Sequence, residues 1–424
     1  MARRWSSSMK ACNLADAVTA SRVTRVTLLL FFVAMASGFA QFGAVASLND
    51  VAHHFGHHTS ARTLQSVVGL SGSVLGIGLA VLRLASLASL PLAALADRWG
   101  RVRVLRRTLW LGLVVTSVAS LSPGYWFFVA CFAVARPLLS ATSTLIQVIT
   151  VELTSSARRI HRLVVIAAGA GLGAGTSAVL HGLIRGPNSF RWLFALALVP
   201  LAVMPRLTKS LPEPPHQRDQ LFLTRLGAVA REWRPRLYVV AAVSFAIGMI
   251  SGPANGFAFV YGEGVLHIAP RIVATVVALS AATGLAGLLV GRTLSRRLGR
   301  RSTVVLGVLA TAATACVAYS GGRDVFILGY MTGVFAAGLL APAAAALSTE
   351  TFPHRIRATA AGWIVVAGVV GATSGLFLFG WIADVVKTAS ANSLRVPALV
   401  TFLPMLPTLL LVRRLPETAG RELD

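Results

Sequence analysis

LADRWGRVRVLRR, residues 95–107, follows a long apolar run and returns in altered form as GRTLSRRLGRRS, residues 291–302. Three pairs of residues align between the two copies: Gly100 with Gly299, Arg98 with Arg297, and Arg101 with Arg300. A short basic turn that recurs about two hundred residues later indicates that the chain is built from two similar halves.

A second repeat supports the same division. ELTSSARR, residues 152–159, corresponds to ETFPHRIR, residues 350–357, and each begins with a glutamate and ends with an arginine seven positions on. The aligned residues are Glu152 with Glu350 and Arg159 with Arg357. Two independent correspondences in matching gaps are much stronger than one motif.

Composition places these halves in a membrane. Only 12% of the residues are charged and 55% are apolar, whereas a soluble domain has about 25% charged residues. The mean hydropathy is +0.74. A spanning helix needs about 20 apolar residues, and the apolar runs are 26–48, 66–95, 104–121, 126–150, 163–184, 190–205, 237–261, 272–291, 303–320, 325–348, 358–383 and 396–412. The first run is too long for the core of a signal peptide, so we expect a retained helix.

The basic residues predict the orientation of these runs. Of the 39 Lys and Arg residues, 30 lie in the termini and even-numbered gaps, seven at the odd-numbered gaps, and two inside runs. This bias places both termini in the cytoplasm. The net charge of +25 therefore reflects topology, and we expect no nucleic-acid partner. The predicted parts are an N-terminal tail 1–25, a six-helix bundle 26–205, a cytoplasmic linker 206–236, a second bundle 237–412 and a tail 413–424.

At these motifs the sequence resembles the major facilitator superfamily. LADRWGR is similar to the family's signature loop after the second helix, and TETFPHRIRA and LPETAGRELD are similar to segments of its sugar-porter and metabolite–proton symporter branches. Ala93 replaces an expected glycine, and Arg296 stands where the second copy would carry an acid. The resemblance implies an all-α membrane protein of twelve helices, in two pseudo-symmetric six-helix bundles that rock around a central cavity.

The inner helix ends carry candidate gating residues. Asp97, Glu152 and Glu350 lie there among many arginines, and carboxylate–guanidinium pairs can latch bundles together. The alternative is that they only anchor topology. The predicted cytoplasmic gate comprises Asp97, Arg98, Gly100, Arg101, Glu152, Arg159, Arg297, Gly299, Arg300, Glu350 and Arg357.

Two arginines lie inside apolar runs. Arg83 precedes Asp97 by fourteen residues and Arg136 precedes Glu152 by sixteen, which places them about 21 Å and about 24 Å above the inner ends. An arginine at that depth is costly unless it meets water or a partner, and no acid lies mid-run. One interpretation is binding of an anionic substrate. The alternatives are structural hydrogen bonds or, as the resemblance implies for Arg136, ion coupling.

Other polar residues are candidates for the cavity or for coupling. Gln41, Asn255 and Tyr330 lie in helices that line the cavity of the resembled fold, and each can bind substrate or join helices. Asp50 and Glu263, near outer helix ends, are possible coupling acids.

Neither a metal site nor a cofactor is expected. His53 and His57, and likewise His54 and His58, have helical i,i+4 spacing, but a solvated outer loop is the preferred interpretation. The glycines of VVIAAGAGLGAG, ending at Gly175, lack the acid of a dinucleotide site and instead form GxxxG pairs. The three cysteines are not spaced as pairs.

The sequence therefore predicts a secondary active transporter, not an enzyme. We expect a small solute, an organic anion or metabolite, to cross the plasma (inner) membrane by alternating access coupled to H⁺. The partners are the solute, the proton and the lipid bilayer, and we expect a monomer. The alternatives are a drug or metabolite exporter of the same fold, or a transport-dead receptor or scaffold.

Overall fold

The structure is a computed structural model. It describes residues 2–57, 63–154, 156–184, 186, 188–213, 231–386 and 394–418, and within these it leaves aside the side chains of 2–23, 156–160, 231, 354, 355 and 358. His58, the central part of the linker (214–230) and the last residues (419–424) lie outside the described residues, and so does the side chain of Arg159.

The described residues form twelve helical segments that are long and apolar enough to cross a membrane, as predicted. The first half contains α1 (Ala2–Ala46), α2 (Leu48–Phe55), α3 (Leu64–Val68), α4 (Gly72–Ala85), η1 (Ser86–Ala88), α5 (Ser89–Trp99), α6 (Arg101–Val118), η2 (Ala119–Leu121), α7 (Tyr125–Glu152), α8 (Ser156–Leu183), α9 (Ser189–Ala195) and α10 (Leu198–Thr208). The second half contains η3 (Arg231–Trp233), α12 (Arg234–Gly256), the π-helix η4 (Val260–Val265), α13 (Pro270–Arg297), α14 (Arg300–Ala318), α15 (Arg323–Glu350), α16 (His354–Val385), α17 (Arg395–Phe402), η6 (Leu403–Met405) and α18 (Thr408–Val412).

The second span differs most from its predicted bounds. The apolar run 66–95 is divided at Gly69, whose φ of +91° ends α3, and the span itself is Gly72–Trp99. The signature stretch is therefore mostly helical. The chain reverses at Gly100 (φ +93°) and, in the second half, at Gly299 (φ +89°). Glycine has no Cβ and adopts these left-handed angles readily, which explains its place in both copies.

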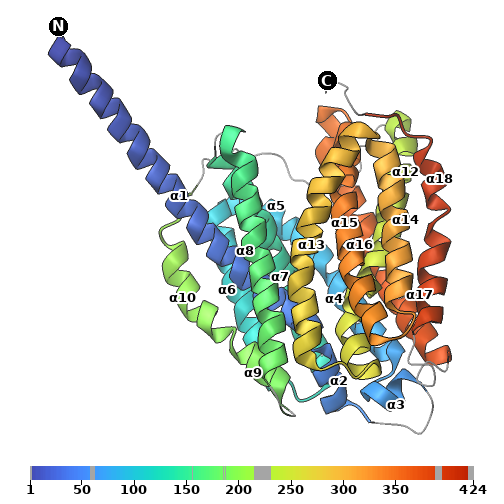
Figure 1. The fold of residues 1–424 in the computed structure, drawn as a ribbon. Coiled ribbons are helices and arrows are strands. Elements are labelled where there is room, and N and C mark those ends of the chain that lie inside the picture. Colours follow the sequence, from blue (N-terminus) through green and yellow to red (C-terminus); the bar gives the residue numbers. More distant parts are fainter. Residues whose placement is uncertain are drawn as a thin grey trace.

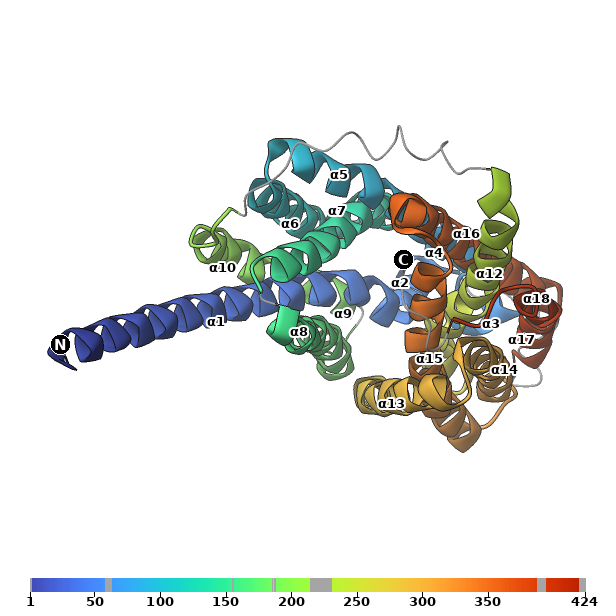
Figure 2. The same ribbon diagram turned by 90° about the horizontal axis from the view of Figure 1, so that it is seen from above.

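The two halves form two bundles that stand side by side (Figures 1 and 2). Figure 1 shows the chain's two ends at the same end of the molecule, as an even number of spans requires. We call this end cytoplasmic, following the distribution of basic residues, and the opposite end outer. Residues 2–25, predicted as a tail, continue the helix of the first span.

The apolar core is divided unequally. One cluster runs from the outer half of the first bundle, including Leu75 and Phe128, into the second bundle, including Val240 and Phe379. The cytoplasmic half of the first bundle has its own cluster around Leu105. The bundles thus share a core toward the outer end and have separate cores toward the cytoplasmic end.

Close helix packing joins the bundles. α4 packs against α16, and α8 packs against α13. A Cβ on Gly380 of α16 would collide with the carbonyl oxygen of Gly72 at the start of α4. Asp384, one turn further on, accepts hydrogen bonds from the backbone N–H groups of Gly72 (2.6 Å) and Ser73 (2.7 Å). This contact caps the N-terminus of α4 with a residue of the other bundle.

The predicted GxxxG pairs of α8 have different environments. A Cβ on Gly169 or Gly173 would clash with the backbone of α1, whereas nothing lies within 4 Å of the Cβ positions of Gly171 and Gly175. Only the first pair therefore serves close helix packing.

The orientation is tested by labelling from outside intact cells. In a variant with the three cysteines replaced by serine, we expect a membrane-impermeant maleimide to label Leu121→Cys at the outer end and to miss Ser210→Cys in the linker. Both positions are exposed, and basic segments stay in the cytoplasm. Permeabilised cells provide the control, since both cysteines should then react. Efficient labelling of Ser210→Cys in intact cells would contradict the orientation.

Candidate functional site

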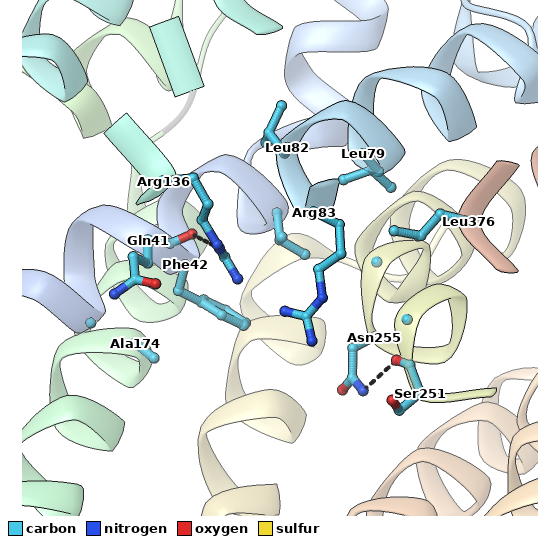
Figure 3. Close-up of a pocket in the computed structure, with 14 residues that line it drawn as sticks. Gln41, Phe42, Leu79, Leu82, Arg83, Arg136, Ala174, Ser251, Asn255 and Leu376 are labelled. Carbon is cyan, nitrogen blue, oxygen red and sulfur yellow. Dashed lines mark hydrogen bonds between the residues drawn. The ribbon is translucent and has the colours of Figure 1, made fainter. Parts of the chain in front are cut away.

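A cavity of about 410 Å³ lies between the two bundles (Figure 3). Its walls come from α1, α4, α7 and α8 of the first bundle and from α12 and α16 of the second. The lining residues are Gly38, Gln41, Phe42, Val45, Leu79, Leu82, Arg83, Arg136, Ala174, Ser251, Gly252, Asn255, Gly256 and Leu376. None of these is an acid, so its charged groups are two arginines on one wall.

Arg83 and Arg136 are brought together from α4 and α7. Arg136 Nη1 donates a hydrogen bond to the carbonyl oxygen of Gln41 at 3.1 Å. The Arg83 guanidinium points into the cavity in Figure 3. The Nε atoms of both arginines are buried and have no hydrogen-bond partner. Two guanidinium cations therefore line one cavity, and each has an N–H group that donates no hydrogen bond.

The three predicted polar residues have different positions. Gln41 lines the cavity, but its amide nitrogen donates to Ser37 Oγ (3.0 Å) and Ser143 Oγ (3.2 Å), so it joins α1 to α7. Asn255 also lines the cavity and is exposed to it, with its amide bonded to Ser251 O at 2.9 Å.

Tyr330 does not line this cavity, which corrects the prediction. It is buried beside a smaller cavity of about 120 Å³, and its hydroxyl donates to Asn255 Oδ1 at 3.4 Å. The two cavities share Ser251 and Asn255 in their walls. Tyr330 therefore reaches the central cavity only through the Asn255 side chain.

The cytoplasmic motif of the first half is an ion-pair cluster. Arg101 contacts Asp97, one helical turn earlier, at 3.3 Å, and it also pairs with Glu152 at the end of α7. The Glu213 carboxylate accepts a hydrogen bond from the backbone N–H of Val102 at 3.0 Å. A carboxylate at this place caps the N-terminus of α6, where backbone N–H groups lack helical partners.

The second half repeats this arrangement without the Asp97 equivalent. Arg300 holds Glu350 through two hydrogen bonds, from Nε at 3.3 Å and from Nη2 at 3.1 Å. Thr418 Oγ1 donates to the same carboxylate at 2.6 Å. Glu417 accepts from the backbone N–H groups of Arg300 (2.8 Å) and Arg301 (3.2 Å), and so caps α14.

These pairs join helices of the same bundle. We expected a latch between bundles, and in this conformation each cluster instead holds its own bundle together. Arg98 and Arg297 are exposed. Arg357 donates to the Phe352 carbonyl at 3.4 Å. A gating role for the motif remains a prediction.

The capping glutamates were missed by sequence reasoning. Glu213 and Glu417 each follow a Leu-Pro pair, at 211–213 and 415–417, immediately after the sixth and the twelfth span. This third internal repeat was the signal that could have identified them. The alignment would have placed the two glutamates at equivalent positions of the two halves.

A third cluster joins the bundles at the outer end. His181, near the end of α8, lies between two carboxylates: its Nε2 is 3.0 Å from Glu263 Oε1, and its Nδ1 is 3.4 Å from Asp50 Oδ2. Asn49 Nδ2 donates to Glu263 at 3.5 Å, and Ser189 Oγ donates to Asp50 at 2.5 Å. Asp50 and His181 belong to the first bundle and Glu263 to the second. The sequence named both acids but not the histidine that brings them together.

The donor atoms of Asp50, His181 and Glu263 lie within 4.8 Å of one another. In this arrangement the two carboxylates contact different nitrogens of one ring, Asp50 at Nδ1 and Glu263 at Nε2. The helical alternative weighed for the outer histidines does not apply, because α2 ends at Phe55 and His57 lies beyond the helix that would align it with His53. His54 instead packs against the rings of Phe55 and Phe190.

The family model described as Major Facilitator Superfamily matches residues 28–322 and 237–423, which together cover most of the chain. The chain belongs to the major facilitator superfamily. The family is one of transporters, so this is a multi-pass membrane transporter of small solutes and not an enzyme.

Proteins similar to this chain are named as transporters of different solutes. A metabolite transport protein of Haemophilus influenzae is 24% identical over 351 residues, covering 78% of this chain and 84% of its own. The nucleoside transporter NupG matches with a TM-score of 0.71 at 14% identity, over 92% of this chain and 98% of its own. The xylose transporter XylE of E. coli, inward open, matches with a TM-score of 0.70 at 15% identity, over 94% and 98%. These structures share the fold with this chain.

The inner clusters of this superfamily member are tested by removing one carboxylate. Glu350→Gln leaves Arg300 without an anionic partner, and Asp97→Asn removes one of the two carboxylates that contact Arg101. A hydrogen bond to a charged group contributes about 1.5–3 kcal/mol, so we expect uptake in proteoliposomes to slow about 10- to 100-fold. Membrane insertion should be normal.

Glu232→Gln, a change at an exposed carboxylate near the start of α12, is the matched control and should transport normally. Substrate affinity measured from one side should also change in the cluster variants, because a shifted conformational equilibrium alters apparent binding. Normal flux and affinity in both variants would leave these residues as topology anchors.

Proposed function

We propose that this protein is a secondary active transporter that carries a small organic anion across the plasma membrane by alternating access. The observation that supports this proposal most directly is the pair Arg83 and Arg136. Both line one cavity between the bundles, and their Nε atoms have no hydrogen-bond partner. Guanidinium groups remain charged in proteins. Two such groups beside a space without an acid repel each other, and a bound anion relieves both the repulsion and the unmet hydrogen bonding.

The opposite wall adds polar groups that are not charged. Ser251 and Asn255 of α12 face the arginines across the cavity, and Asn255 connects to Tyr330 behind it. A solute with an acidic group at one end and hydroxyl or carbonyl groups at the other matches this distribution. Because the two walls belong to different bundles, such a solute contacts both bundles at once and can bias their relative position.

Alternating access is supported by how the bundles meet. They share an apolar core and several hydrogen bonds at the outer end, whereas the cytoplasmic ion pairs stay within one bundle. This arrangement favours a cavity closed toward the outside. Coupling to protons is the second part of the proposal, with Asp50 and Glu263 as the acids. The D-xylose-proton symporter, with which this chain shares the fold at a TM-score of 0.71 and 18% identity, is consistent with it.

Substrate charge is tested by comparing uptake of a neutral sugar with that of its sugar acid and its phosphate ester in proteoliposomes. We expect wild type to prefer an anion. Arg83→Gln and Arg136→Gln should each weaken anion binding about 10- to 100-fold, the loss of one charge-assisted contact of about 1.5–3 kcal/mol. Lysine at either position should restore part of the affinity, because it keeps the charge and loses the planar fork.

Arg292→Gln, an exposed arginine of α13, is the matched control and should leave affinity unchanged. A preference for neutral or cationic solutes, with affinity unaltered in both cavity variants, would rule out anion recognition. Binding of a solute without flux of any tested solute would favour a receptor over a carrier.

A further inference from the structure

The outer cluster of Asp50, His181 and Glu263 contains both acids that the proposed function assigns to proton coupling, together with a histidine to which it gives no role. His181 is 2% exposed and Glu263 is 7% exposed, so the imidazole and one carboxylate are held away from water at the junction of the two bundles. Buried ionisable groups are costly unless their charges and hydrogen bonds are matched. Whether the charges and hydrogen bonds of these three groups are matched depends on how many protons the groups hold together.

Neither neutral form of the imidazole fits this position. A neutral ring carries one N–H and one bare nitrogen. If the hydrogen is on Nε2, the lone pair of Nδ1 faces Asp50, and if it is on Nδ1, the lone pair of Nε2 faces both oxygens of Glu263. Nδ1 is buried and has no hydrogen-bond partner in the present geometry. One added proton, on the ring or on Glu263, removes the conflict.

The surroundings of Glu263 also favour a proton on the cluster. Burial raises the pKa of Glu263, an effect that the neighbouring Asp50 carboxylate increases and that hydrogen bonds from His181 and Asn49 partly offset. In such a pair the proton belongs to the cluster more than to one residue. Other titratable or charged groups on the surrounding elements are His53, His54, Arg191, Tyr261, His267, Arg271 and Asp384. Arg191 is bonded to the carbonyl oxygens of Ser120 and Ser122.

We propose that Asp50, His181 and Glu263 together bind one exchangeable proton that holds the outer ends of the two bundles together, so that loss of this proton favours opening toward the outside. The inference rests on the proposed alternating access, because that motion must separate Glu263 from His181. In the closed state the proton lies between carboxylates, and in the open state each group meets water. The closed state therefore binds the proton more tightly.

The direction of the pH effect follows from this difference. A state that binds a proton more tightly gains population as the pH falls and loses it as the pH rises. Low pH should close the outer end, and high pH should release it. A difference of one pKa unit between the two states changes their ratio up to about tenfold.

Distance measurements between spin labels across the outer end test the proposal without any substrate. The labels are placed at Leu121→Cys and Val385→Cys, which are 73% and 65% exposed, in full-length protein with native cysteines replaced by serine. We expect the ratio of long to short distances to rise about tenfold between about pH 5.5 and about pH 8.5, the range in which imidazoles titrate.

Two variants and two controls make the result specific. His181→Gln and Glu263→Gln should each reduce the pH-dependent change to less than about twofold, because a glutamine does not titrate. Asp384→Asn weakens the hydrogen bonds that Asp384 accepts from the N-terminus of α4. The share of molecules at the long distance should therefore rise at both pH values, and the pH dependence should remain. His54→Gln, an exposed histidine of α2, should behave as wild type.

The outcomes separate this inference from the proposed function. If both distances are present but their ratio does not change with pH, the proposed shared proton of Asp50, His181 and Glu263 is overturned and alternating access is not. A full pH response in His181→Gln would have the same meaning. A ratio that changes with zinc or a chelator at constant pH, and not with pH, would overturn it in favour of a metal. A single short distance in every variant, Asp384→Asn included, would count against alternating access itself.

Discussion

A charge inside a bilayer is costly unless it meets water, an opposite charge or enough hydrogen bonds, and this constraint organises the whole protein. Among the described residues, nearly all ionisable groups lie at helix ends. Within the spans, Arg83 and Arg136 share one cavity. The three sets of charged residues, at the cytoplasmic ends, in the cavity and at the outer end, meet the constraint to different degrees.

The cytoplasmic sets are satisfied within each bundle. Arg101 and Arg300 neutralise Glu152 and Glu350, and Glu213 and Glu417 cap the helices that follow the two glycine turns. These contacts therefore stay within one bundle. The outer set is satisfied only when the bundles meet, since His181 and Glu263 come from different halves. The cavity set is left incomplete, which is the property expected of a binding site.

Much of this architecture could be predicted from local sequence. The twelve spans, the two halves and the importance of Gly100 and Gly299 were predicted from apolar runs, basic residues and repeats, because lipid imposes a pattern on each helix separately. The depth of Arg83 and Arg136 followed from counting residues along a helix. The position of Tyr330 behind Asn255 did not, because a residue's distance from a cavity depends on how its helix is rotated against its neighbours.

Hydropathy and charge in the sequence predicted the membrane spans, because they report directly on the energy of each segment in lipid, and the repeats and the resemblance of the motifs indicated a two-bundle transporter. Which charged groups meet depends on how the helices pack. Asp50, His181 and Glu263 are far apart along the chain and in different helices, and no spacing rule connects them. Their contact arises where α8 packs against α13 and the π-helix η4 packs against α2 across the bundle interface, so that side chains from both halves share a small buried volume.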